Sequence, residues 1–110
     1  MANLTPKNFY IGNTQTGNVY TLSSNVGSYA IIKNINICNT GGSTVTSNIH
    51  VIPSGGSAVA NNQIFSNAPV LSGETITYDT SIVLNAGASL YITSSAATVS
   101  LVISGVDYLT

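Results

Sequence analysis

The sequence predicts an all-β protein, built as a single antiparallel β-sandwich of jelly-roll or Greek-key type with about seven or eight short strands. The first observation is that apolar and polar residues alternate with a period of two through most of the chain. The second is that no window of about eleven residues has the spacing of an amphipathic helix. The third is that Gly and Asn recur in turn-like clusters along 110 residues, a length typical of one domain.

The first element is residues 1–18, which precede the best-patterned region. Its large apolar side chains are Leu4, Phe9, Tyr10 and Ile11. Two interpretations stay open for it. It is either an N-terminal arm that reaches a neighbouring subunit or the first edge strand of the same domain. In both cases residues 19–110 form the β-sandwich domain.

The next well-patterned strand lies between residues 29 and 39 and contains one break in its pattern. Ile35 and Ile37 share a face, whereas Ile32 has the opposite phase. This break predicts either a β-bulge near Lys33 and Asn34 or a strand that is covered on both faces.

The same alternation marks the remaining strands. Their core-facing residues are expected to be Tyr20 and Leu22, Ile49 and Val51, Ile76 and Tyr78, Leu90 and Ile92, and Val99, Leu101 and Ile103. Residues 58–69 are the least regular, and we expect them to form the long crossing connection of a Greek key. The expected turns are Gly12–Gly17, Asn25–Ser28, Asn39–Gly42, Pro53–Gly56, Ser72–Gly73 and Asn85–Gly87.

Charge is unusually scarce, because charged residues make up 5% of the chain where about a quarter is ordinary. Two lysines cannot form the basic patch that nucleic acids or anionic membranes require, so neither partner is expected. The polar surface consists instead of 13 Asn, 15 Ser and 13 Thr. A weakly charged surface associates readily, which favours a homo-oligomer or a larger assembly.

The N-terminal residues lack both the charged and the apolar region of a signal peptide, and no apolar run approaches the roughly 18 residues of a membrane span. We therefore expect synthesis in the cytoplasm. Cys38 is the single cysteine, so no disulfide can form within the chain.

Few side chains are able to carry acid, base or metal chemistry. Glu74 and Asp79 are separated by an odd number of residues, which places them on opposite faces of a regular strand. His50 falls on an outer face, where we interpret it as an exposed or interface histidine, and Cys38 is interpreted as a small packing residue. The sequence thus predicts no enzyme, no catalytic residues, no metal and no cofactor.

The six tyrosines allow two interpretations, as platforms for sugars or as anchors at a protein interface. By phase, Tyr20 and Tyr78 belong to the core and Tyr91 points outward.

Six segments together resemble a known class of protein. They are Tyr20-Thr-Leu, Tyr29-Ala-Ile-Ile-Lys-Asn-Ile-Asn-Ile-Cys-Asn-Thr-Gly41, Val45-Thr-Ser-Asn-Ile-His-Val-Ile-Pro53, Leu71-Ser-Gly-Glu-Thr-Ile76, Val83-Leu-Asn-Ala-Gly87 and Val99-Ser-Leu-Val-Ile-Ser-Gly-Val106. From about residue 19 to residue 107 the chain resembles small β-sandwich virion proteins of tailed bacteriophages, such as capsid decoration proteins and head or tail accessory proteins. The resemblance implies a non-enzymatic, multi-copy role in the virion, with the major capsid protein or other virion proteins as partners.

These observations lead to one expected function and one alternative. The expected function is capsid decoration, or cement, in which adhesive contacts stabilise the particle. The expected interface residues are Leu4, Phe9, Tyr10, Ile11, His50 and Tyr91. The alternative is a host-surface or carbohydrate-binding module of a phage tail or adhesin. There Tyr91 and the loops at residues 12–18, 39–43 and 61–67 would contact a glycan.

Overall fold

The computed structural model describes residues 4–13, 16–59, 62–96 and 98–109, and these ranges contain eight strands and no α-helix. The strands are β1 (Leu4–Gly12), β2 (Thr16–Thr21), β3 (Tyr29–Asn39), β4 (Val45–Ile52), β5 (Gln63–Val70), β6 (Thr75–Asn85), β7 (Ser89–Ser94) and β8 (Val99–Tyr108). Consequently no helix long and apolar enough for a membrane span occurs in the described ranges.

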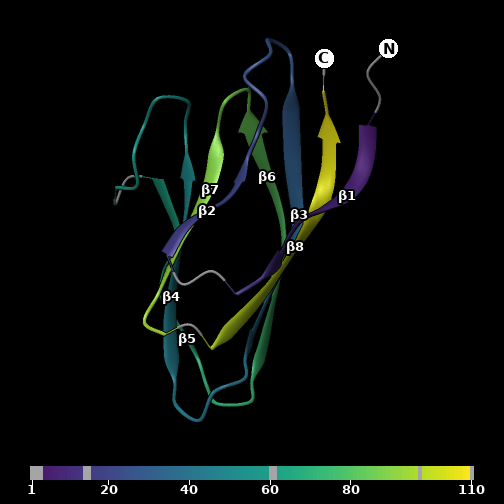
Figure 1. Cartoon of the computed structure of the whole chain (residues 1–110). Helices are drawn as coiled ribbons and strands as arrows, with labels where there is room; N and C mark the ends of the chain where they lie inside the picture. The colour runs from purple at the N-terminus through teal and green to yellow at the C-terminus, as the bar shows by residue number, and fades with distance from the viewer. Residues whose placement is uncertain (1–3, 14–15, 60–61, 97, 110) are drawn as a thin grey trace.

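The strands form two four-stranded antiparallel sheets, which face each other in Figure 1. The first sheet has the order β1-β8-β3-β6, and the second has the order β2-β7-β4-β5. Each strand of the first half of the chain pairs with its counterpart in the second half: β1 with β8, β2 with β7, β3 with β6 and β4 with β5. This winding is that of a jelly roll, and the predicted all-β sandwich is confirmed.

The core lies between the sheets and is supplied by inward-facing residues of all eight strands. Its fully buried large members include Ile32, Ile35, Ile37, Ile49, Leu84, Leu90, Ile92, Leu101 and Ile103. Each such side chain contributes about 1.5–3 kcal/mol by leaving water. The core-facing phase predicted for β3, β7 and β8 is therefore confirmed.

A line of bulges crosses the first sheet. Lys33 is an extra residue of β3 relative to β8, and Thr80 and Ser81 of β6 together lie opposite Lys33. Phe9 is likewise an extra residue of β1 relative to β8. The bulge predicted near Lys33 is confirmed, and its neighbours in the sheet bend at the same level.

The β3–β4 and β5–β6 connections lie at the end of the sandwich opposite the termini (Figure 1), and hydrogen bonds of the buried Asn39 side chain link three connections. Asn39 is fully buried, and its amide nitrogen donates to the carbonyl oxygens of Ser43 (2.7 Å) and Val70 (2.9 Å). Its amide oxygen accepts from the backbone N–H of Gly41 (2.9 Å) and the hydroxyl of Thr98 (3.2 Å). The β3–β4, β5–β6 and β7–β8 connections are thus held by one side chain.

One expectation about the connections is wrong. Residues 58–69 do not form a strandless crossing, because β5 begins at Gln63 and pairs with β4. Two irregularities in this pairing break the period of two, which hid the strand, and Pro69 is tolerated because β5 is an edge strand. Three of the expected turns, Asn25–Ser28, Pro53–Gly56 and Ser72–Gly73, lie between strands and are confirmed. Asn39–Gly42 and Asn85–Gly87 each begin on the last residue of a strand, and the turn expected at Gly12–Gly17 includes residues 14 and 15, which lie outside the described residues.

Candidate functional site

The expected interface residues of β1 separate into two groups. Leu4 and Ile11 are 57% and 67% exposed, so both present apolar side chains to the surroundings. Phe9 is buried in the core, with its ring centroid 4.6 Å from that of Tyr20, and Tyr10 packs partly against the same core. Phe9 is therefore packed within its own chain, because it faces the space between the sheets, as does Lys7 two residues before it.

In the segment that was open to two interpretations, residues 16–18 belong to β2, and Leu4–Gly12 form β1, which pairs with β8 from Leu4 opposite Tyr108 to Gly12 opposite Leu101. Strand β1 forms an edge strand of the first sheet in the isolated chain. Its exposed residues Leu4 and Ile11 lie near its two ends. A neighbouring protein that contacts them therefore contacts a strand that is already paired with β8.

An ion pair joins β1 to β8. Lys7 Nζ lies 3.0 Å from Asp107 Oδ2, and the Asp107 side chain is only 4% exposed. The ammonium group also lies 5.9 Å from the ring centroids of both Phe9 and Tyr20. Sequence reasoning did not single out Asp107, although its shared phase with Leu101 and Ile103 would have placed it on the inner face.

The surroundings of this pair predict a loss of stability at alkaline pH. Burial raises the pKa of Tyr20 above its ordinary 10.0, and the hydrogen bond to Asp107 raises the pKa of Lys7 above its ordinary 10.5. Groups whose pKa is raised by folding stabilise the protein fully below about pH 10, and this stabilisation is lost as the pH rises through the folded-state values. Urea unfolding should show stability falling from about pH 10 upward, and less steeply in Tyr20→Phe. A stability that is constant or rising over this range would contradict the assignment.

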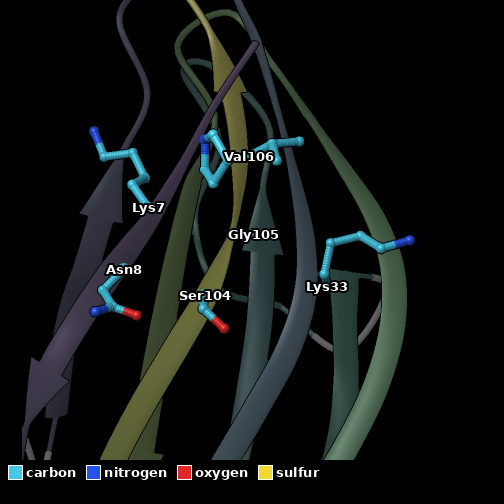
Figure 2. Close-up of a pocket in the computed structure, with 7 residues that line it drawn as sticks. Lys7, Asn8, Lys33, Ser104, Gly105 and Val106 are labelled. Carbon is cyan, nitrogen blue, oxygen red and sulfur yellow. The ribbon is translucent and has the colours of Figure 1, made fainter.

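A shallow hollow of about 490 Å³ on the first sheet contains both lysines of the chain (Figure 2). Pro6, Asn8, Ser104 and Val106 also line it, but the ammonium groups of the lysines point away from each other in Figure 2. Lys7 Nζ donates to Asp107 Oδ2 at 3.0 Å, and Lys33 Nζ donates to Ser81 Oγ at 2.8 Å. The hollow is therefore lined by lysine stems rather than by charges, and it is not built to hold an anion.

His50 lies on the outer face of β4, as its phase predicted, but it is only 8% exposed. His50 was expected to be exposed or at an interface, and it is not exposed, because Val59 and Asn62 of the β4–β5 connection contact it. His50 Nδ1 lies 2.9 Å from Asn62 Oδ1 and 3.1 Å from the Val59 carbonyl oxygen. Since both partners are acceptors, Nδ1 carries the proton. Asn62 in turn donates to the Ser57 carbonyl oxygen at 2.8 Å, so His50 anchors this connection.

Tyr91 lies at the centre of the outer face of the second sheet. In the register of the strands, Asn18 of β2, Tyr91 of β7, His50 of β4 and Gln63 of β5 form one row across the sheet. The Tyr91 ring is half-buried and meets the His50 ring edge-on, with centroids 6.1 Å apart. Beside this row, Asn48 Oδ1 accepts from Gln63 Nε2 at 2.7 Å. We call Asn18, Asn48, His50, Gln63 and Tyr91 the amide–tyrosine face.

Of the three loops expected around Tyr91, two prove to be partly strand: residues 16–18 belong to β2 and residues 63–67 to β5, where Asn18 and Gln63 lie in the row of Tyr91. Residues 14, 15 and 61 of these expected loops lie outside the described residues. The third, residues 39–43, lies at another end of the molecule, where the Asn39 side chain is buried and cannot contact a ligand. The structure also reveals an outward-facing pair that phase reasoning missed. Tyr29 and Tyr108 stack on the first sheet with centroids 5.2 Å apart, because they are register partners at adjacent strand ends.

The acidic and metal-ligating side chains do not converge. Asp79 is exposed on β6, Glu74 accepts from the backbone N–H of Leu71 within its own turn, and Cys38 is half-buried on the outer side of β3. Among the described residues, no group of three or more His, Cys, Asp or Glu side chains could hold a metal ion.

Comparison of the chain with protein-family models, with curated proteins and with solved structures gives no match. The interpretation of the two outer faces therefore rests on their own geometry and chemistry.

Proposed function

We propose that this protein is a non-enzymatic structural component of a bacteriophage virion, a capsid decoration protein present in many copies. The observation that supports this best is the chemistry of the two outer faces. The second sheet presents none of the charged residues of the chain on its outer face, and the first presents Lys33 and Asp79, with Lys7 at its β1 edge paired to Asp107. Hydroxyl and amide groups lose less free energy than charges when a neighbouring protein displaces their water.

Adhesion in many copies needs only modest contacts. A copy that contacts two neighbours on a shell binds more tightly than either contact alone would allow. Once the first contact forms, the second binding surface is held nearby at a high effective concentration. The exposed apolar residues Leu4 and Ile11 on the edge strand β1 supply the anchors, and the uncharged outer faces allow close neighbours. The partners are the major capsid protein or other proteins of the shell.

The test compares binding of purified variants to phage shells that lack the protein. Leu4→Ser combined with Ile11→Ser should lower shell binding by at least about tenfold, the effect of losing two buried apolar side chains. Val26→Ser is the matched control, since Val26 is 93% exposed and belongs to the β2–β3 loop, not to β1. Circular dichroism should show both variants folded. Failure of the unaltered protein to bind shells would overturn the proposal.

A second candidate function is glycan binding, favoured by the amide–tyrosine face. An aromatic ring flanked by amides can stack on the apolar face of a sugar while the amides bond its hydroxyl groups. If this function is correct, glycan arrays should show binding that Tyr91→Ala abolishes. Tyr29→Ala, on the outer face of the other sheet, should leave that binding unchanged. No binding to any glycan, or equal loss in both variants, would exclude this use of the face.

A further inference from the structure

The edge formed by β6 differs from the other three edges of the sandwich. Within the described part of the chain β6 has β3 on one side and no strand on the other. The β1 edge contains Pro6 and Lys7, the β5 edge contains Pro69, and the β2 edge has only six residues. β6 has eleven residues and contains neither Pro nor Lys, and its protective features are confined to its middle, where Asp79 precedes the bulge at Thr80 and Ser81.

The inner face of β6 is only partly covered. Ile76, Tyr78 and Ile82 pack against the core but remain half-exposed, whereas Ile35 and Ile37 on the neighbouring strand β3 are fully buried. A further strand beside β6 would cover these side chains and would also pair the backbone groups along the edge. The strand that fits must place apolar residues opposite Ile76, Tyr78 and Ile82.

We propose that β6 pairs antiparallel with β6 of a second copy of this chain, about a two-fold axis at Thr80. In this register Tyr78 lies opposite Ile82 of the second copy and Ile76 lies opposite its Leu84, so apolar residues meet on the inner face. The bulge at Thr80 and Ser81 coincides with the axis, and the pairing of β6 with β3 is regular on both sides of it. The inference rests on the proposed function, because a protein that acts in many copies needs contacts between copies.

Charge complementarity selects this register. Lys33 reaches across the sheet to Ser81, and Figure 2 shows its side chain extended toward β6. Asp79 is exposed on the same outer face and is bonded to the uncharged amide of Asn34 at 3.0 Å. With Thr80 on the axis, Asp79 of each copy lies opposite Ser81 of the other, next to Lys33. Two reciprocal ion pairs result. A register with Asp79 on the axis would instead place two carboxylates opposite each other, which is destabilising.

Light scattering coupled to size-exclusion chromatography tests the pairing on the full chain. The protein should be a dimer, and Lys33→Asp or Asp79→Lys alone should raise the dimer Kd by at least about tenfold. The double reversal, Lys33→Asp with Asp79→Lys, should restore the dimer. Dimers that are indifferent to all three variants, or a monomer at every concentration, would overturn the proposal.

Disulfide trapping tests the register itself. In a Cys38→Ser background, Thr80→Cys should form a cross-linked dimer on oxidation with diamide, because the two cysteines meet at the axis. Thr75→Cys is the control and should not, because in this register Thr75 lies opposite Asn85 at the far end of the strand. Cross-linking at position 75 but not at 80 would refute the register. Shell binding measured in parallel separates the two proposals: a monomer that binds shells refutes only the pairing, and a dimer that does not bind refutes only the virion function.

Discussion

Gly105→Ala is expected to destabilise the protein by about 3 kcal/mol, near the upper end of the cost of overpacking a core. A Cβ at position 105 would overlap the carbonyl oxygen of Ile31 and would lie 2.9 Å from Phe9 Cε2. The Ile31 carbonyl belongs to the backbone beside the Lys33 bulge, so it cannot move without disturbing the pairing of β3 with β8. Urea unfolding monitored by circular dichroism measures the loss.

Gly42→Ala is the matched control for this prediction. An added Cβ at Gly42 meets no atom within 4 Å, so the free energy of unfolding should change by less than about 1 kcal/mol in either direction. Equal effects of the two substitutions would show that the close approach of Ile31 to Gly105 is not what requires a glycine there.

Asn39→Ala is expected to cost a similar amount, about 3 kcal/mol, because it removes four hydrogen bonds of a fully buried residue, three of them to backbone groups that lose this partner. The same urea titration measures it. Asn13→Ala, at an exposed position between β1 and β2, should have almost no effect. A loss below about 1 kcal/mol for Asn39→Ala would mean that water replaces the amide and that the three connections are not held by it.

Asn39→Asp distinguishes the donor role of the amide from its size. A carboxylate matches the shape of the amide but cannot donate to the carbonyl oxygens of Ser43 and Val70, and its charge would be buried. Relative to the unaltered protein, this variant should therefore be more destabilised at neutral pH than at about pH 4, where a buried carboxyl group is protonated. A pH-independent difference would contradict the role assigned to the amide hydrogens.

The sequence predicts those features of the fold that depend on the alternation of apolar and polar residues within a single strand. The Lys33 bulge follows from a phase break between Ile32 and Ile35, and the outer position of His50 follows from the phase of β4. The cover over His50 could not be predicted, because it depends on where the β4–β5 connection returns. Strand β5 was missed for a related reason, since its pairing with β4 is irregular.

The candidate site shows the same division. Alternation placed Tyr91 on an outer face, but only the strand order brings Asn18, His50 and Gln63 beside it from three other strands. Phe9 was assigned to an interface because nothing in residues 1–18 indicates that they pair with the last strand, which places Phe9 beside Tyr20 in the core. The alternation of the last strand indicated that Asp107 faces inward. Nothing in the sequence indicated that Lys7 is its partner, because the first and last strands come together only in the folded jelly roll.

Cryo-electron microscopy of phage particles made with and without this protein tests the central claim most directly, namely that the uncharged outer faces serve as contacts between proteins. Particles made with it should show stoichiometric density for the sandwich on the shell, with at least one outer face or the β1 edge against a neighbour. Particles made without it should lack this density and lose integrity at a lower temperature. Particles in which the sandwich is absent, or touches the shell only through the β2–β3 loop, would contradict the account.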